Sequence, residues 1–155
     1  MIIIMLQILL GVLIANFYDW AIHRFILHGL GKNKRSFWHF HWQHHNIART
    51  SAGVDNTFLK NGYFKEKLSL VFLALAHSPI ALWYPTLAAT MGVYLLTYYF
   101  VHMKAHLDPQ WARETIPWHW DHHMGKNQDK NWCVVMPLCD IIFRTREKYF
   151  RSEFL

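Results

Sequence analysis

The stretch Trp38-His-Phe-His-Trp-Gln-His-His45 decides how this chain is organised. It contains a box in which two further residues separate one histidine from an adjacent pair of histidines, and the same box returns near the C-terminal end. A simpler pair of histidines precedes each box. Ten of the 12 histidines therefore fall into four clusters, in the order pair, triplet, pair, triplet. They are His23 and His28; His41, His44 and His45; His102 and His106; and His119, His122 and His123.

The spacing within these clusters suits metal ligands on helices. Residues four apart share one face of an α-helix, so His41 and His45 project together, as do His102 and His106. The adjacent His44 and His45 diverge by about 100°. Such divergence favours ligands that serve two metal ions a few ångströms apart.

The first pair does not follow this rule. His23 and His28 would diverge by about 140° on a continuous α-helix. We therefore expect them to serve different metals, unless Gly29 ends the helix and lets His28 swing inward. Ten imidazoles are too many for one closed four-ligand site, whereas two ions with about five histidines each, and one open position on each, agree with the count.

Composition favours a membrane protein over a nucleic-acid-binding protein. The chain of 155 residues is long enough for a single domain, 1–155, and is 53% hydrophobic with a mean hydropathy of only +0.03. Apolar segments must therefore be concentrated. The net charge of +6 comes from cations that flank those segments, which is typical of the cytoplasmic side of a membrane, and we expect no nucleic-acid partner. Cys133 and Cys139 predict reduced, packed thiols, with a metal-ligand role as the alternative.

Three segments predict transmembrane helices, at about 2–18, 68–83 and 86–103. Residues 2–18 carry no charge, and they lack the positive start and cleavage site of a signal peptide, which is the alternative interpretation. Residues 68–103 contain no charged side chain and would span about 54 Å as one straight helix, far more than a bilayer core. Pro79 and Pro85 therefore predict a hairpin turn between two crossings.

Cations next to these segments predict the orientation. Those concerned are Lys32, Lys34, Arg35, Lys60, Lys65, Lys67 and Lys104. The positive-inside rule places them, and all four histidine clusters, on the cytosolic side. The predicted fold is an all-α integral membrane domain whose cytosolic-side helices carry a di-metal histidine cluster.

The remaining segments are predicted as connections. Ser36 is expected to cap a short helix that carries the first triplet, and residues 46–62 are expected to form a loop. Residues 132–143 are too short to span and predict an interfacial or re-entrant segment. Arg144, Arg146, Lys148 and Arg151 predict a basic tail at the lipid surface.

Carboxylates should support the metal ligands. Ten neutral imidazoles leave the charge of two divalent ions uncompensated, so acidic side chains should accept N–H hydrogen bonds from the outer ring nitrogens. The first candidate is Asp19, one turn before His23, followed by Asp121, Asp140 and Asp108. The alternative for each is an ordinary helix cap or surface acid. His39 and His77 lie outside the clusters. His39 is expected to be an ordinary interfacial histidine, with a hydrogen bond near the ligand rings as the alternative. His77 is expected to be a neutral histidine bonded to a neighbouring helix, with a place in a substrate channel as the alternative.

With these motifs in hand, the chain resembles the fatty acid hydroxylase superfamily, which includes sterol desaturases, C4-methylsterol oxidases and fatty acid 2-hydroxylases. The four clusters stand in that family's order, and residues 131–145 are similar to a segment that follows its last box. Arg144-Thr145 departs from the Gly-Thr that is usual there. Carotenoid hydroxylases are similar to the first half, but their third box usually has one more residue than the pair at His102 and His106.

The resemblance implies a dioxygen-dependent enzyme with two metal ions, functionally iron, that hydroxylates a fatty acyl or sterol-type lipid in lipid biosynthesis. Zinc could occupy the site in an overexpressed sample, because imidazole binds both metals. Electrons are expected from a separate protein of the cytochrome b5 or ferredoxin type with its reductase. A lipid desaturase or carotenoid hydroxylase with the same site, and a non-enzymatic membrane metal-binding protein, are the alternative functions.

Overall fold

The computed structural model describes residues 1–60 and 63–149, and these form helices and loops without a strand. The all-α prediction is confirmed. In chain order the helices are α1 Ile2–Ala21, the π-helix η1 Ile22–Gly29, the 3-10 helices η2 Leu30–Lys32 and η3 Phe37–His39, α2 Phe40–Thr50, α3 Thr57–Lys60, α4 Phe64–His77, the 3-10 helix η4 Ser78–Leu82, α5 Pro85–Leu107, α6 Pro109–Thr115, α7 Pro117–Met124 and α8 Leu138–Ile142.

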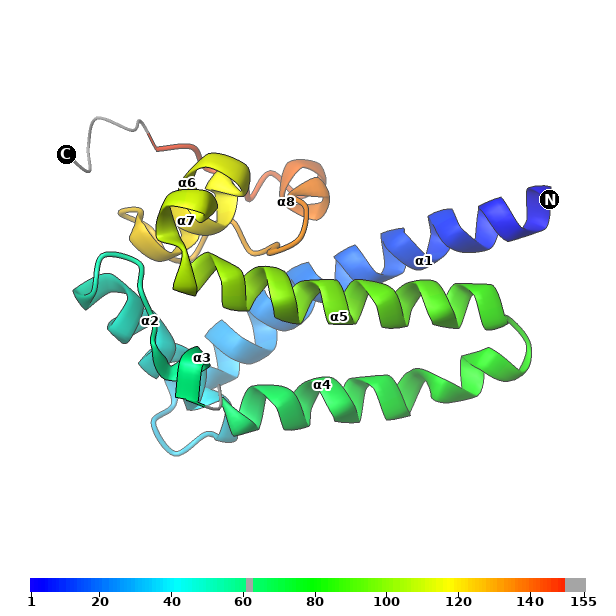
Figure 1. The fold of residues 1–155 in the computed structure, drawn as a ribbon, viewed down its shortest axis with the longest axis horizontal. Coiled ribbons are helices and arrows are strands. Elements are labelled where there is room, and N and C mark those ends of the chain that lie inside the picture. The colour runs from blue at the N-terminus through cyan, green and yellow to red at the C-terminus, as the bar shows by residue number, and fades with distance from the viewer. Residues whose placement is uncertain (61–62, 150–155) are drawn as a thin grey trace.

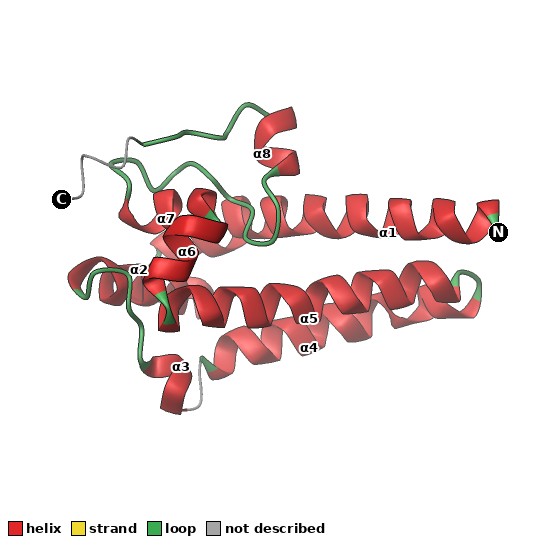
Figure 2. Ribbon diagram, turned by 45° about the horizontal axis from the view of Figure 1, so that its top comes forward, coloured by secondary structure: helices red, strands yellow, loops and turns green. Residues whose placement is uncertain are grey.

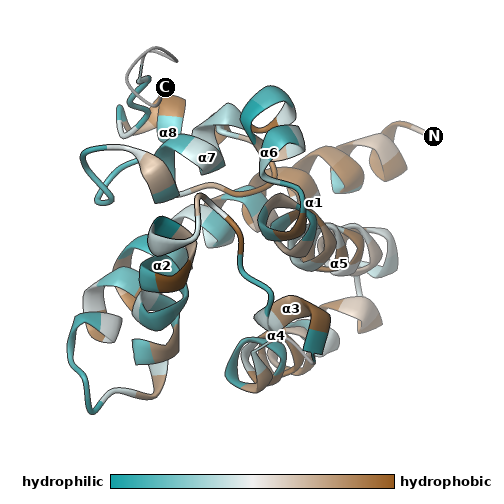
Figure 3. Cartoon of the chain, turned by 60° about the vertical axis from the view of Figure 1, so that its left-hand side comes forward, coloured by the Kyte–Doolittle hydropathy of each residue, from teal (hydrophilic) through white to brown (hydrophobic). Residues whose placement is uncertain are grey.

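Three long helices, α1, α4 and α5, run side by side (Figures 1 and 2). The N-terminus and the turn between α4 and α5 lie at one end, and α2, α3, α6 and α7 gather at the other (Figure 1). Hydrophobic residues dominate the long helices, while α2, α6 and α7 are largely hydrophilic (Figure 3). The fold therefore separates an apolar end from a polar end.

The contact between α1 and α5 is the main apolar core of the long helices. Ala15 of α1 packs against Leu87, Met91 and Tyr94 of α5. The helices come close at Gly11, where an added Cβ would lie 2.9 Å from Thr90 Cβ. Glycine at this point removes the side chain that would otherwise hold the two helices apart.

One helical stretch, Ile2–Lys32, is long and apolar enough to cross a membrane, and it contains the first predicted crossing. The segments predicted to cross at 68–83 and 86–103 form α4 with η4, and α5. The predicted hairpin turn is confirmed, because η4 ends at Leu82 and α5 begins at Pro85. Large apolar side chains such as Phe72 and Val93 are exposed on these helices, at 72% and 63%.

The predicted helix cap and the predicted loop at 46–62 each agree with the structure only in part. Ser36 caps a short helix, since its Oγ accepts from the Trp38 N–H, but this helix is η3, and the first triplet lies on α2, which follows it directly. The loop predicted at 46–62 is wrong in part, because α2 continues to Thr50 and α3 lies within that range; residues 61–62 lie outside the described residues. Arg49 holds the end of α2 by donating to the carbonyls of His123 and Gly125.

Residues 132–143, predicted to be an interfacial or re-entrant segment, are exposed only in their second half. Trp132, Cys133 and Val134 are buried, whereas Ile141 and Ile142 on α8 are exposed. The cause is hydrogen bonding to α1, described below, which holds the backbone of the first half inside the fold. Both cysteines are free and buried, as predicted.

The prediction that Arg146 belongs to a basic tail at the lipid surface is also wrong. Its guanidinium pairs with Asp121 at 3.0 Å and donates to Asn131 at 2.9 Å. Arg151 lies outside the described residues. Arg144 adopts a φ of 55°, in the left-handed region that favours glycine. This backbone conformation explains why glycine suits the position that Arg144 occupies here.

Candidate metal centre

The π-helix η1 brings the first histidine pair together. Its i→i+5 hydrogen bonds stack residues that are five apart, just as an α-helix stacks residues four apart. The rings of His23 and His28 consequently lie on one face, with centroids 5.2 Å apart. The prediction that they serve different metals is wrong. The π-helix ends at Gly29, as the alternative prediction required, but η2 follows directly, so the π-helical geometry and not a swing at Gly29 brings His28 inward.

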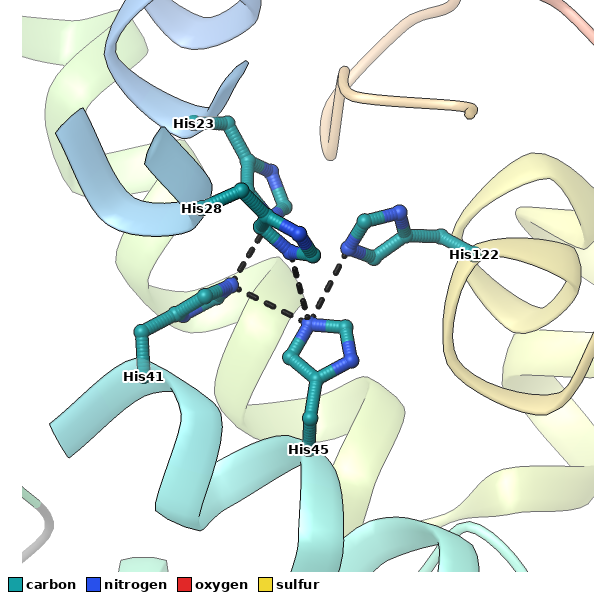
Figure 4. Close-up of side chains that lie close together, drawn as sticks. All are labelled: His23, His28, His41, His45 and His122. Atoms are coloured by element: carbon teal, nitrogen blue, oxygen red, sulfur yellow. Dashed lines mark hydrogen bonds between the residues drawn. The ribbon is translucent and has the colours of Figure 1, made fainter. Parts of the chain in front are cut away.

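Five ring nitrogens converge in what we call the first histidine group, formed by His23, His28, His41, His45 and His122, all within 4.8 Å of one another. His41 Nε2 lies 2.9 Å from His23 Nε2 and 3.1 Å from His45 Nε2. His45 Nε2 in turn lies 3.2 Å from His28 Nε2 and 3.1 Å from His122 Nε2 (Figure 4). Three separate segments, η1, α2 and α7, supply these side chains.

A second histidine group, formed by His44, His102, His106 and His123, has the same convergence within 4.8 Å. His119 lies beside it, with its Nε2 3.2 Å from His106 Nε2. The two groups are adjacent, because the rings of His45 and His123 stack at 4.0 Å. As the spacing predicts, adjacent histidines divide between the groups, and the structure gathers all ten candidate ligands, each no more than 2% exposed.

Main-chain carbonyls fix the tautomer of three rings. The Nδ1 atoms of His23, His106 and His122 face the carbonyl oxygens of Trp132, Gly53 and Lys130, at 2.5, 3.0 and 2.6 Å. A carbonyl can only accept, so each Nδ1 must carry the proton. In a neutral imidazole the Nε2 atom then holds a lone pair.

Side-chain oxygens have the same effect on three further rings. His44 Nδ1 donates to Asp55 Oδ2 at 2.7 Å, and His102 Nδ1 donates to Glu66 Oε1 at 2.8 Å. His45 Nδ1 lies 2.7 Å from Gln128 Oε1. The Nε2 lone pairs of these rings are therefore also available for coordination.

The distances between these nitrogen atoms show whether the residues suit metal ions. Nitrogen atoms that each lie about 2.1 Å from one ion are at most about 4.2 Å apart, and the observed separations of 2.9 to 3.2 Å agree with this limit. The Nε2 atoms of His44, His102 and His123 are buried without a hydrogen-bond partner. Because converging lone pairs repel one another and cannot share a hydrogen bond, the arrangement suits cations.

Burial keeps the rings in the form that binds metal. Loss of solvation lowers the pKa of His41, His45 and His123 well below the ordinary value, and neighbouring histidines lower it further. For His122, burial lowers the pKa to about 4. Neutral imidazole is the ligating form, so these pKa shifts favour coordination at neutral pH.

Two carboxylates that the sequence did not identify contact the second group. Asp55 is fully buried and accepts from His44, from the Tyr63 hydroxyl and from the Thr57 N–H. Burial alone raises the pKa of its carboxyl group, but the hydrogen bonds from these three residues outweigh burial and lower it. Glu66 is 6% exposed and holds His102. Asp55 lies in a turn-rich segment and Glu66 lies between two lysines, so both resembled surface acids.

The carboxylates that the sequence did identify have other partners. Asp19 Oδ2 accepts from the Tyr94 hydroxyl and from the N–H groups of Val134 and Val135. Its Oδ1 atom has no partner, so the prediction that Asp19 accepts from a histidine is wrong. Its bonds instead hold in place the extended segment that begins at Trp132, whose carbonyl faces His23.

The other three predicted carboxylates are also wrong as direct partners of the ligand rings. Asp140 accepts from the N–H groups of Trp132 and Cys133 and from the Thr145 hydroxyl. It therefore supports the same segment as Asp19. Asp121 pairs with Arg146, and Asp108 caps α6. The side chains of all three face backbone, hydroxyl or guanidinium groups and not the ligand rings.

An apolar cavity of about 340 Å³ opens beside the histidines. Side chains of α1, α4 and α5 form its walls, and His41, His44 and His102 lie at one end. His77 lines it farther along, while His39 lies outside it and donates from Nδ1 to the Gly31 carbonyl oxygen at 2.9 Å. An apolar molecule in this cavity would reach both histidine groups.

Comparison with known proteins agrees with this geometry. A family model described as "Fatty acid hydroxylase" matches residues 8–145. The matched range contains the nine histidines of the two groups and also His119. No curated protein and no solved structure matches the chain at a significant level.

Proposed function

The chain belongs to the fatty acid hydroxylase family, and from this premise we propose that it is a membrane-bound oxygenase that hydroxylates a fatty acyl or sterol-type lipid. The observation that carries the proposal is the position of two adjacent sets of converging imidazole lone pairs at one end of an apolar cavity. A lipid chain is the occupant that such a cavity suits, and unreactive C–H bonds are the groups it would present to the histidines.

We propose that the first histidine group would hold one metal ion and that the second group, with His119, would hold another. Both ions are functionally iron, although zinc could replace them in an overexpressed sample, because imidazole does not discriminate between the two. A redox metal supplies what side chains lack, namely the oxidising power to insert one oxygen atom of dioxygen into a C–H bond while the other leaves as water.

The chain's own residues would orient the substrate and exclude water. Leu70 and Leu73 of α4 face the cavity together with Met91 and Leu95 of α5. These side chains offer an extended apolar surface that holds a hydrocarbon chain in one direction. Phe40 lines the cavity close to His41 and His44, where it would keep the reacting carbon in a dry environment.

The proposal includes three membrane crossings, by α1, by α4 with η4, and by α5. Exposed apolar side chains on all three helices support this arrangement. Lys32, Arg35, Lys65 and Lys104 occur at the ends of these segments nearest the histidines, which favours a cytosolic metal site. Electrons would then come from a separate cytosolic-side protein of the cytochrome b5 or ferredoxin type with its reductase.

A test is to load the protein with iron in lipid nanodiscs, add a reductase system and candidate lipids, and supply isotopically labelled dioxygen. The expected product is a hydroxylated lipid that contains one labelled atom, detected by mass spectrometry. A desaturated, unlabelled product would instead identify a desaturase with the same site, and a labelled hydroxycarotenoid would identify a carotenoid hydroxylase. Exchangeable metal without dioxygen consumption would contradict the proposal and indicate a metal-binding protein.

A further inference from the structure

The cavity contains a polar pair some distance from the histidine groups. Tyr18 of α1 and His77 at the end of α4 both line it, and the Tyr18 hydroxyl lies 3.1 Å from His77 Nε2. Their rings meet edge to face, with centroids 5.0 Å apart. Polar and ionisable side chains are costly in membrane-embedded walls, so such a pair calls for a functional explanation.

The direction of the hydrogen bonds within the pair follows from the backbone. His77 Nδ1 lies 2.8 Å from the Leu73 carbonyl, which can only accept, so Nδ1 carries the proton of the neutral ring. His77 Nε2 must then accept the hydroxyl proton of Tyr18. The Tyr18 oxygen keeps lone pairs but has no proton left to donate. The Tyr18 oxygen can therefore only accept a further hydrogen bond, and this favours a ligand that donates one.

The pair lies at a fixed distance from the end of the cavity where the histidine groups lie. Tyr18 precedes His23 by five residues, about 8 Å along α1, and His77 follows Glu66 by eleven residues, about 16 Å along α4. A lipid with a polar group at Tyr18 would therefore extend its apolar part toward the histidines. The pair would fix which carbon reaches them.

We propose that Tyr18 and His77 form a polar subsite that recognises a hydroxyl group on the lipid substrate. This inference rests on the proposed function, and it specifies the substrate class as a hydroxylated lipid. The hydroxyl donates to the Tyr18 oxygen, while His77 holds the Tyr18 proton away from the substrate. A free carboxylate, an ester or an ether can only accept, so the subsite disfavours these groups.

The test compares three probes of similar length: hexadecan-1-ol, its methyl ether and hexadecane. Binding to the protein in phosphatidylcholine nanodiscs is measured without dioxygen or reductant, and binding to empty nanodiscs is subtracted. Wild-type protein should bind the alcohol about five-fold more tightly than the ether, which is the effect of one neutral hydrogen bond. Equal affinity for the alcohol and the ether would overturn the proposal.

Variants separate recognition from a purely structural tie between α1 and α4. Tyr18→Phe should bind all three probes equally while keeping the affinity for hexadecane. His77→Ala frees the Tyr18 proton, so the affinity for the ether should rise toward that for the alcohol. A structural tie predicts instead that both variants lose affinity for the three probes in parallel, and that result would contradict the proposal.

Tyr99→Phe is the matched control, because Tyr99 is a tyrosine of α5 that does not line the cavity. It should keep the wild-type preference for the alcohol, and loss of that preference in this variant would also contradict the assignment to Tyr18. The binding assay needs no turnover. Labelled lipid products together with equal binding of alcohol and ether would therefore reject this inference alone, whereas absence of any oxidised product would reject the proposed function.

Discussion

The two histidine groups have similar inner geometry but different outer surroundings. In the first group, the outer nitrogens face neutral acceptors, namely the carbonyls of Trp132 and Lys130 and the amide oxygen of Gln128. In the second group, two outer nitrogens donate to the buried carboxylates of Asp55 and Glu66. The second group can therefore balance the charge of a cation locally, while the first depends mainly on dipoles. We expect the second group to bind metal more tightly.

One carboxylate does approach the first group, but its interaction is weaker than those of Asp55 and Glu66. Asp129 Oδ1 lies 3.5 Å from His28 Nδ1, and the Asp129 side chain is 52% exposed. Asp129 also pairs with the exposed Lys32 at 3.2 Å. Solvent screening and this competing cation reduce what Asp129 can contribute to the first group. The four predictions below test this difference between the groups.

The largest effect should come from removing one ligand of either group. His44→Ala should lower the metal content of the second group, and His122→Ala that of the first, because each removes a lone pair that converges on its neighbours. Each variant should lose lipid oxidation by more than about 100-fold, since loss of an outer partner alone costs 10 to 100-fold. Metal analysis and product formation are the measurements. His39→Ala, outside both groups, should behave as wild type, and full activity in either ligand variant would refute the assignment.

The next largest effect should come from Asp55→Asn. The amide keeps the shape of the side chain but removes the negative charge beside His44, so the metal affinity of the second group should fall by about 10 to 100-fold. Asp129→Asn makes the same chemical change beside the first group. We expect it to lower the metal affinity of the first group by less than about three-fold. Competition with a chelator measures both affinities. Equal losses in the two variants would remove the proposed difference between the groups.

The division of adjacent histidines between the two groups could be predicted from the sequence, because it follows from the periodicity of the α-helix. His44 and His45 must diverge on any α-helix, and the structure divides them between the groups. The pairing of His23 with His28 could not be predicted in this way. Residues five apart share a face only where the backbone adopts i→i+5 hydrogen bonds, and nothing in the local spacing indicates that rare geometry.

The supporting carboxylates were beyond prediction for a different reason. Glu66 meets His102 across 36 positions of sequence, and Asp55 reaches His44 because its own N–H donates to the His106 carbonyl at 3.0 Å. Both contacts depend on how separate helices pack. Asp19 illustrates the opposite error, since its closeness to His23 along the chain suggested a contact, while its carboxylate binds the backbone of Val134 and Val135.

A gain of affinity would sharpen the comparison. Gln128→Glu replaces the neutral oxygen beside His45 Nδ1 with a carboxylate and so gives the first group the kind of partner that Asp55 provides to the second. Charge-assisted hydrogen bonds are roughly twice as strong as neutral ones, so the metal affinity of the first group should rise by about three to ten-fold. Chelator competition again measures it. Gln128→Ala is the control and should weaken binding, and a Glu variant no tighter than wild type would show that outer charge does not distinguish the groups.

The smallest effect should come from Tyr63→Phe, which tests whether the charge of Asp55 or its full set of hydrogen bonds matters. The Tyr63 hydroxyl donates to Asp55 Oδ2 at 2.6 Å, the same oxygen that accepts from His44. Burial raises the pKa of Tyr63, so this hydroxyl is a neutral donor, and its removal should cost about 1 kcal/mol of folding stability. The carboxylate and its bond from His44 remain, so the metal affinity of the second group should change by less than about three-fold. Thermal unfolding measures the folding stability and chelator competition measures the metal affinity, with Tyr99→Phe as the control for loss of a tyrosine hydroxyl. If Tyr63→Phe lowered the metal affinity as much as Asp55→Asn, the orientation of the carboxylate, more than its charge, would make the second group different from the first.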